Sequence, residues 1–520
     1  MKKTFKIISI YLGVLLLAAV ATVVFCAAFL FFYRDGNIFG IKYINAKEII
    51  YATETENMDD LQVIEVQSSD FDVKFSVNKN VDTLVGAMRN KVFGYAKKSK
   101  AQAKFGLEYN EETKVAVFTS VEPKGWLNKK DCYIEIAIPE NWANKGDDLV
   151  IKTSKGDITV GNDNECNIGN LAVESLKGDV NISNLTLSKG LNIDIGSGTL
   201  FVDGECETAG ALNSTIKVGS GMVNISKINV EKFNLGVVEV KSIKRGKIGI
   251  LKADELITDG NINGGGKIEV GEVGFVDFSS LDTNLYINSI IGGNQNATSS
   301  RITITGNGDM YINNADCNLE VNGNNGEIEI GTVTGTLASS TNKGNIIVSQ
   351  ALKLISAVTE SGSINISFSS AALDYVDTDI NDANKNRAVV ATTKNGHIIV
   401  KGLQNGYITA TGNGRISLEY DKVVGQNEMI SQAGGINIIV PNPSDTSAVN
   451  EFAFNLKVTT EVSADVKVGV AGSIGSVDFT QSGTHEFNNI YNSASSTSNN
   501  LNVISSTGAI KIRSADLVGF

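Results

Sequence analysis

Proline, histidine and cysteine are scarce in this chain. Its 520 residues include only 4 prolines, 2 histidines and 5 cysteines. No proline lies between residues 140 and 440, and because proline cannot donate a hydrogen bond to a β-ladder, this stretch is free to form continuous sheet. The cysteines form no Cys-x-x-Cys pair and His397 and His485 are far apart in the sequence, so we expect no zinc site, no other metal and no cofactor.

Positive charge is also in deficit. The chain has 57 Asp and Glu against 45 Lys and Arg, a net charge of −12, which opposes binding to phosphate backbones and predicts no nucleic-acid partner. One basic stretch, residues 88–104, interrupts this pattern and is interleaved with aromatic residues. It is either an ordinary solvated loop or a contact surface for lipid headgroups or an anionic wall polymer. The candidate polyanion contacts are Arg89, Lys91, Lys97, Lys98, Lys100 and Lys104.

The long hydrophobic run of the chain stands near its N-terminus. Residues 7–33 carry no charge, and as a helix they would be about 40 Å long, which is enough to cross a bilayer. A cleaved signal peptide is the alternative, but its apolar stretch is usually only about 7 to 15 residues. Lys2, Lys3 and Lys6 precede the run, so the positive-inside rule places residues 1–6 in the cytoplasm. We predict a single-pass cell-membrane protein whose residues 7–33 contact the lipid bilayer and whose remaining chain is extracytoplasmic.

Glycine, in contrast, is abundant at 52 residues and marks a repeat. The repeated phrase is glycine, a polar residue, an aliphatic, any residue and a second aliphatic, as in "GDITV" at Gly156 and "GDVNI" at Gly178. Neighbouring copies are mostly roughly 18 to 25 residues apart, and the gap from Gly266 to Gly308 is about two steps, which predicts one hidden, degenerate copy. The phrases begin at Gly156, Gly178, Gly198, Gly221, Gly246, Gly266, Gly308, Gly326, Gly344, Gly362, Gly396, Gly414 and Gly434.

Each phrase predicts a turn followed by a short strand. Alternation places Ile158 and Val160 on one face and Asp157 and Thr159 on the other. Two inward aliphatics cannot form a core alone, but stacked turns would align them in columns. We therefore predict an all-β fold, an elongated, β-helix-like β-solenoid of roughly 18–25-residue rungs, with an N-terminal transmembrane helix and β-rich caps that protect the open ends. The predicted segments are a cytoplasmic N-terminus (1–6), a transmembrane signal-anchor helix (7–33), a β-rich N-terminal cap (34–149), β-solenoid repeats (150–440) and a β-rich C-terminal cap (441–520).

Two segments resemble a known family. "CYIEIAIPENWANKGDDLVIKTSKGDITV" (Cys132 to Val160) combines an alternating strand that ends in Ile-Pro, a spacer and the first repeat phrase. "LNVISSTGAIKI" (Leu501 to Ile512) resembles a closing strand of the same kind. Together they are similar to the "putative-adhesin" family of bacterial β-repeat domains of unknown function, and the resemblance covers Leu61 to Ser514. It implies a surface-exposed β-solenoid, often behind a membrane anchor.

No catalytic constellation stands out in the sequence, although one arrangement invites the question. Asp157 and Asp179 share one position of the repeat and Lys155 and Lys177 another, and solenoid enzymes that cleave polysaccharides use acidic and basic side chains on adjacent rungs. Outward polar residues in a repeat are more often simply solvated, so we predict that the chain is not an enzyme. We expect an adhesin-like protein that binds a surface glycan, a wall polymer or another protein through its outward polar faces. A self-associating envelope scaffold and a polysaccharide lyase or hydrolase are the alternatives.

Overall fold

The structure is a computed structural model. It describes the backbone of residues 2–32, 41–45, 49–55, 60–68, 70–97, 104–122, 126–143, 145–161, 166–203, 206–209, 212–225, 234–292, 299–369, 388–442, 452–462, 465–470, 474–479, 482–491 and 497–515. Side chains are described within these ranges except at 2–10, 27–32, 41–55, 90–97, 126–131, 143, 203, 470, 474–479 and 489. The chain divides into two units, Met1–Ile168 with Glu174–Val180, and Gly169–Val173 with Asn181–Phe520.

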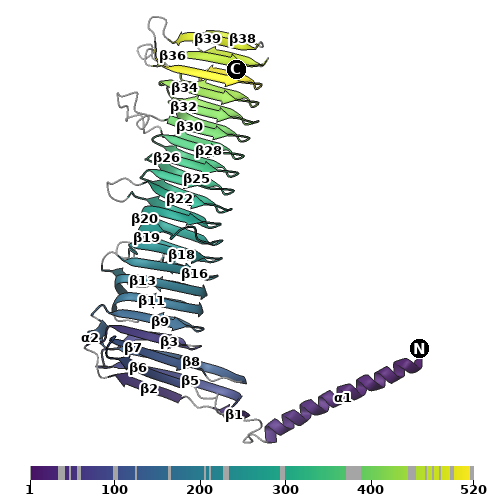
Figure 1. Ribbon diagram of the computed structural model, residues 1–520, viewed down its shortest axis with the longest axis vertical. Coiled ribbons are helices and arrows are strands. Elements are labelled where there is room, and N and C mark those ends of the chain that lie inside the picture. The colour runs from purple at the N-terminus through teal and green to yellow at the C-terminus, as the bar shows by residue number, and fades with distance from the viewer. Residues whose placement is uncertain are drawn as a thin grey trace. The chain divides into compact units, whose positions relative to one another are not determined.

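The first unit begins with helix α1 (Lys2–Phe32), the coiled ribbon next to the N-terminus in Figure 1. Large apolar side chains in its middle, such as Leu15 and Phe25, are exposed. Within the part of the chain that the structure describes, no helix has both the length and the apolarity needed to cross a bilayer.

The first unit continues with strands β1 (Ile41–Asn45), β2 (Ile49–Thr55), β3 (Val63–Ser68), β4 (Asp72–Val77), β5 (Leu84–Lys97), β6 (Lys104–Asn110), β7 (Val115–Val121), β8 (Trp126–Ile138), β9 (Asp148–Thr153) and β10 (Ile158–Val160), with the short helix α2 (Glu140–Ala143) between β8 and β9. β1, β2 and β8 pair antiparallel with β5, and β6 pairs antiparallel with β7. β3 lies between β7 and β9, and β4 between β8 and β10, all in parallel pairs. The antiparallel strands β5 and β6 therefore border the first parallel rungs.

Parallel stacking thus starts well before residue 150, where the repeat phrase predicted its beginning. β3 and β4 read "VIEVQS" and "DVKFSV" and alternate buried and more exposed residues as a repeat strand does. Neither follows a corner glycine of the repeat phrase, so the sequence pattern placed them in the predicted cap region 34–149.

The second unit contains the remaining strands, apart from β11 (Cys166–Lys177) and β12 (Val180–Ser183), in which the division between the units falls. Its first strands are β13 (Leu185–Ser197), β14 (Thr199–Asp203), β15 (Glu207–Thr208), β16 (Asn213–Val218), β17 (Met222–Ile225), β18 (Val237–Ile243), β19 (Lys247–Ile257), β20 (Lys267–Ser280), β21 (Asn284–Ile290) and β22 (Ser300–Ile304). They are followed by β23 (Met310–Ala315), β24 (Leu319–Asn322), β25 (Ile328–Val333), β26 (Leu337–Thr341), β27 (Ile346–Ala351), β28 (Ile355–Thr359), β29 (Ile364–Phe368), β30 (Ala388–Thr393), β31 (Ile398–Leu403), β32 (Asn405–Ala410), β33 (Ile416–Tyr420), β34 (Gln426–Ser431) and β35 (Ile436–Val440).

Two parallel ladders run through these strands (Figure 1). One joins β21, β23, β25, β27, β29, β31, β33 and β35 in sequence order. The other joins β22, β24, β26, β28, β30, β32 and β34. β21 occupies the rung between β20 and β23, so the predicted degenerate copy between Gly266 and Gly308 is present. The all-β solenoid predicted from the repeat agrees with this pairing.

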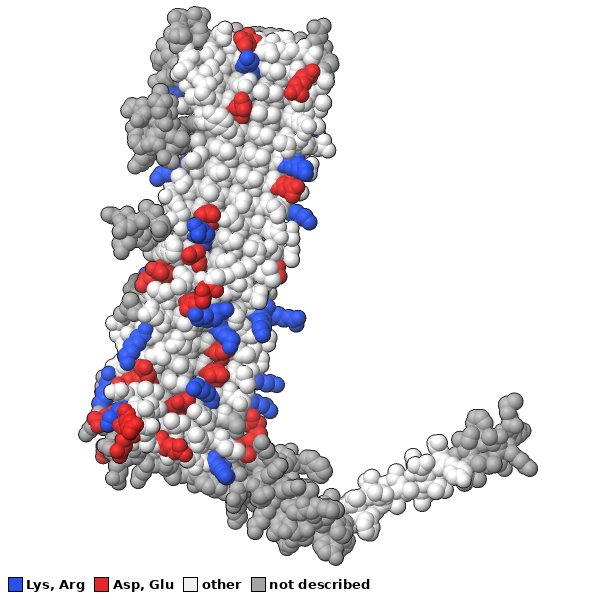
Figure 2. Space-filling view, viewed as in Figure 1, with Lys and Arg blue, Asp and Glu red and all other residues white. Residues whose placement is uncertain are grey.

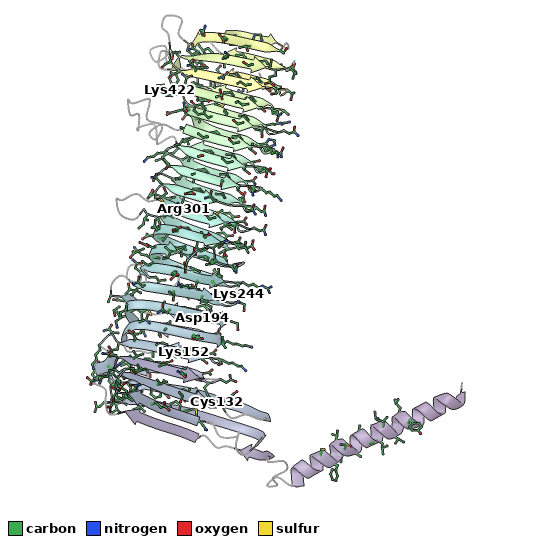
Figure 3. All side chains as sticks on the ribbon, in the orientation of Figure 1. Cys132, Lys152, Asp194, Lys244, Arg301 and Lys422 are labelled. Carbon is green, nitrogen blue, oxygen red and sulfur yellow. The ribbon has the colours of Figure 1, made fainter. Side chains whose placement is uncertain are left out.

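The core of the second unit is a set of aliphatic columns, one residue from each rung. The second aliphatic of successive phrases is paired from strand to strand and buried each time. Buried and less buried residues alternate strictly in short strands such as β29, β33 and β35, whereas the long strands β19 and β20 interrupt the alternation. The side chains of all these strands are drawn in Figure 3. One such column consists of Ile312, Ile330, Val348, Ile366, Val400, Leu418 and Ile438.

The last strands in the sequence are not the last in space. β40 (Asn500–Ser505) and β41 (Ile510–Ser514) stack directly on β34 and β35. The earlier strands β36 (Phe454–Thr460) and β37 (Val466–Val470) stack on the other side of β40 and β41. β39 (Gly483–Ile490) and β38 (Ile474–Phe479) then pair antiparallel with β36 and β37. Antiparallel pairing thus ends the parallel ladder at this side of the second unit.

Candidate ligand-binding groove

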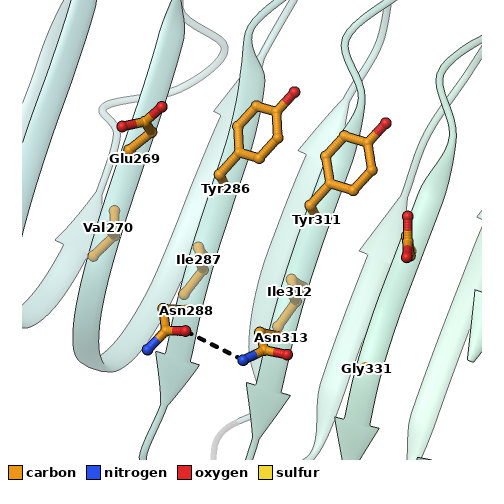
Figure 4. A pocket seen from close by; sticks show the side chains of 10 residues that line it. Glu269, Val270, Tyr286, Ile287, Asn288, Tyr311, Ile312, Asn313 and Gly331 are labelled. Atoms are coloured by element: carbon orange, nitrogen blue, oxygen red, sulfur yellow. Dashed lines mark hydrogen bonds between the residues drawn. The ribbon is translucent and has the colours of Figure 1, made fainter. Parts of the chain in front are cut away.

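A shallow groove of about 380 Å³ lies on the outer surface of β20, β21, β23 and β25 in the second unit (Figure 4). We call it the tyrosine groove. The side chains of Val270, Ile287 and Ile312 point into the core and are buried, so at these positions the backbone of three neighbouring strands forms the groove floor. Its lining residues are Glu269, Val270, Tyr286, Ile287, Asn288, Tyr311, Ile312, Asn313, Glu329 and Gly331.

The parallel register aligns one wall of the groove. Glu269 pairs with Tyr286, Tyr286 with Tyr311, and Tyr311 with Glu329. Because these residues occupy the same position on successive strands, their side chains project from the same face about 4.8 Å apart. The row therefore reads carboxylate, phenol, phenol, carboxylate.

The two tyrosine rings stack on each other. Their centroids are 4.7 Å apart and their planes differ by 12°, a geometry in which aromatic pairs attract beyond simple burial. The ammonium of Lys267 lies 4.1 Å from the centroid of the Tyr286 ring. Since the stacked rings leave no room between them, this ammonium covers the face of Tyr286 that is turned away from Tyr311.

Amides form the opposite wall. The Nδ2 group of Asn313 donates a hydrogen bond to Oδ1 of Asn288 (3.2 Å), drawn as the dashed line in Figure 4. On the next strand the wall stops, because the residue there is Gly331. A Cβ at this position would lie closer than 3.0 Å to the carbonyl oxygen of Asn313, so close rung packing requires glycine and leaves the groove open at this end.

Charge differs between the two ends of the groove. At one end Glu269 binds Lys247 (2.7 Å) and Lys267 (2.6 Å). Burial alone would raise the pKa of the Glu269 carboxyl, but the hydrogen bonds from the two lysines lower it below its usual value. At the other end no described Lys or Arg forms a salt bridge with Glu329. Burial, followed by the nearby carboxylates of Asp309, Glu327 and Glu329, raises the pKa of the Tyr311 phenol.

The predicted polyanion contacts lie in the first unit and away from this groove in the sequence. Arg89, on β5, has its guanidinium carbon 5.3 Å from the ring centroid of Tyr133. Lys104 is the first residue of β6 and is exposed. Lys98 and Lys100 lie outside the described residues, as do the side chains of Lys91 and Lys97. The predicted basic surface therefore stays a prediction.

Sequence reasoning missed the tyrosine groove, although a signal was present. "LYI" at Leu285 and "MYI" at Met310 place a tyrosine between two inward aliphatics on successive rungs. The first of these lies in the degenerate copy, where Thr283 stands at the corner instead of glycine. Without the register, Tyr286 could not be aligned with Tyr311.

Metal and nucleophile chemistry finds little support in the described part of the chain. No group of three or more His, Cys, Asp or Glu is arranged to hold a metal among those residues. Nδ1 of His397 accepts a hydrogen bond from the backbone N–H of Arg415 (3.2 Å). Burial raises the pKa of the Cys166 thiol to about 12, so this thiol stays protonated and unreactive at neutral pH.

Residues 61–263 match the family model described as Toastrack DUF4097. This segment begins just before β3 and ends after β19, and over it the chain is similar to a β-repeat family of unknown function. A crystal structure described as "a putative cell adhesion protein from Clostridium sporogenes" is 10% identical, with 90% of this chain and 100% of that chain covered and a TM-score of 0.14. No curated protein matches the chain.

Proposed function

We propose that this chain is a non-catalytic, membrane-anchored binding protein that holds a surface glycan against the outer face of its β-solenoid. The observation that carries the proposal is the tyrosine groove. It combines aromatic rings, which pack against the apolar C–H faces of sugar rings, with amides and carboxylates that can satisfy sugar hydroxyl groups. Pockets with a few polar groups on a preformed apolar frame are typical of ligand sites.

The direction of the groove favours a linear polymer. Its lining residues come from the same positions on β20, β21, β23 and β25, so it crosses the strands. Successive strands are about 4.8 Å apart, and a sugar ring in an extended polysaccharide advances by about the same distance. A linear polysaccharide in the groove could therefore place one sugar ring against each rung.

The carboxylate of Glu269 is better suited to binding than to acid catalysis. A general acid that cleaves glycosides needs a carboxyl pKa raised toward neutrality. The lysine pair Lys247 and Lys267 shifts the pKa of Glu269 in the opposite direction. This supports a role in holding the ligand.

The anchor is part of the same proposal. Residues 7–33 form an uncharged run after Lys2, Lys3 and Lys6, and α1 (Lys2–Phe32) is a continuous helix over nearly all of it. With the N-terminus in the cytoplasm, the solenoid would face a surface glycan or wall polymer.

The test is a glycan and wall-polymer array with the full-length chain in detergent, together with light scattering and product analysis. We expect saturable binding by a monomer with no released product. Tyr286→Ala with Tyr311→Ala should abolish this binding. Tyr407→Ala removes a 47% exposed tyrosine outside the groove and should leave it unchanged. Release of shortened polysaccharide would show an enzyme, and concentration-dependent oligomers without glycan binding would show a scaffold.

A further inference from the structure

We infer that the Tyr311 end of the tyrosine groove is a cation site that takes the ammonium group of an amino-sugar polymer. This inference rests on the proposed function and names the ligand class. It follows from a comparison of the two ends of the same aromatic stack.

At the first end the protein supplies its own cation. The ammonium of Lys267 lies 4.1 Å from the ring centroid of Tyr286 and 2.6 Å from Oε1 of Glu269. An ammonium held between a ring face and a carboxylate gains both cation–π attraction and an ion pair. The Glu269 hydrogen bond, more than the opposing effect of burial, raises the pKa of the Lys267 ammonium, so this cation is fixed at neutral pH.

At the second end the same ring and carboxylate are present without a lysine. Tyr311 pairs with Glu329 on β25, as Tyr286 pairs with Glu269 on β20. Glu329 is exposed, and no described Lys or Arg forms a salt bridge with it, with Asp309 or with Glu327. Within the described part of the protein, these three carboxylates therefore have no ion-pair partner.

The second end also has room for a ligand. The amide wall made by Asn288 and Asn313 stops at Gly331, which has no side chain and lines the groove. An ammonium carried on a sugar could approach the outer face of Tyr311 there and reach the Glu329 carboxylate. The Asn313 amide beside it offers both a donor and an acceptor to the neighbouring hydroxyl groups.

These features select among surface polymers. An anionic wall polymer would be repelled by Asp309, Glu327 and Glu329, and a neutral glycan would leave their charge uncompensated. A glycan with free amino groups satisfies the aromatic face and the carboxylates at once. The polymer we expect is therefore an amino-sugar glycan that is at least partly de-N-acetylated.

The experiment compares two oligomers that differ only in whether their amino groups are free or acetylated. Full-length protein in detergent is titrated calorimetrically with a glucosamine hexamer and with an N-acetylglucosamine hexamer, at equal ionic strength. A cation–π contact and one partly exposed ion pair together predict about tenfold tighter binding of the glucosamine hexamer. Glu329→Gln should remove this preference, so that the variant binds the two hexamers with equal affinity. Glu419→Gln, which removes another exposed carboxylate on β33, should retain the preference.

The outcomes separate this inference from the proposed function. Equal affinity for the two hexamers, with both lost in Tyr286→Ala, would keep the glycan site and overturn the cation site. A preference that survives in Glu329→Gln would also overturn it. Titration with spermidine separates the ammonium from the sugar. Binding of spermidine that is lost in Glu329→Gln, with no binding of either hexamer, would retain a cation site but overturn both the amino-sugar ligand and the proposed glycan function.

Discussion

Oδ1 of Asp157 accepts a hydrogen bond from the backbone N–H of Asp179, the residue at the same position of the next repeat phrase (2.8 Å). Oδ1 of Asp72 in turn accepts from the backbone N–H of Asp157 (2.8 Å). The shared column of Asp157 and Asp179 therefore links rungs through their backbones. This gives the polar residue after the corner glycine a structural role that does not depend on catalysis.

The same link recurs in the second unit with other side chains. Oδ1 of Asp309 accepts from the N–H of Glu327 (2.9 Å), and Oδ1 of Asn345 accepts from the N–H of Ser363 (3.0 Å). What these residues share is a short side chain with an acceptor oxygen. Asp, Asn or Ser follows the glycine in five of the thirteen repeat phrases.

Replacing Asp157 tests the link. Asp157→Ala removes the side-chain acceptor of the Asp179 N–H. This should lower the free energy of local unfolding by about 1 kcal/mol. Asp157→Asn keeps the acceptor and should behave almost like the wild type. Hydrogen exchange of the segment that contains the Asp179 amide measures the difference, because solenoid rungs can open locally. Equal exchange rates in the two variants would show that the side-chain acceptor at position 157 contributes nothing to rung stacking.

The corner glycines allow a matched pair of substitutions. A Cβ on Gly434 would lie closer than 3.0 Å to the carbonyl oxygen of Gly414, whereas a Cβ on its neighbour Gly435 would meet the Ala509 oxygen at 3.4 Å, an ordinary contact. Gly434→Ala should therefore destabilise the protein by about 2 kcal/mol or more, because backbone must shift to make room. Gly435→Ala should cost less than about 1 kcal/mol. Thermal unfolding of both variants decides this, and similar losses would show that the rungs are not in close contact at this corner.

The repeat phrase was sufficient to predict the stacked parallel strands because its information is local. Each copy except the degenerate one, which has Thr283 at the corner, carries its own corner glycine and two inward aliphatics, as at Gly308 with Met310 and Ile312. The early rungs formed by β3 and β4 lack the phrase, so only pairing in space reveals them.

The order in which the last strands stack in space was not predictable from the repeat phrase. β40 and β41 lie between β34–β35 and β36–β37, against the sequence order. Alternation along a strand determines which side chains face inward, but it does not say which strand is the neighbour. The tyrosine groove was missed for the same reason, since it exists only when Tyr286 and Tyr311 are in register.

Acid should destabilise the end of the tyrosine groove where Glu269 pairs with Lys247 and Lys267. The folded-state pKa of Glu269 is lowered from its usual value of 4.5, so its contribution to stability is present above about pH 4.5 and is lost as the pH falls through the folded-state value. The effect should be small, because the side chain is 38% exposed and solvent screens its ion pairs. Hydrogen exchange of β20 and β21 should therefore accelerate as the pH falls below 4.5, after correction for intrinsic rates, and this acceleration should be weaker in Glu269→Gln. An identical pH response in the variant would mean that the Lys247 and Lys267 pairs do not contribute.

The last prediction concerns the proposed membrane anchor, residues 7–33. Leu16→Arg together with Val20→Arg places two charges in the middle of the uncharged run, each of which opposes insertion by about 2.5–3.5 kcal/mol. We expect the wild type to remain with membranes after an alkaline carbonate wash and its solenoid to be digested by protease added to intact spheroplasts. The double arginine variant should be lost from the washed membranes, while Leu16→Ala with Val20→Ala should be retained, because alanine adds no charge. If the arginine variant stayed with the membranes, another part of the chain would have to cause the association, and the basic stretch around Arg89 and Lys104 would be tested first. If the wild-type solenoid resisted protease in intact spheroplasts but not after lysis, the predicted orientation would be wrong.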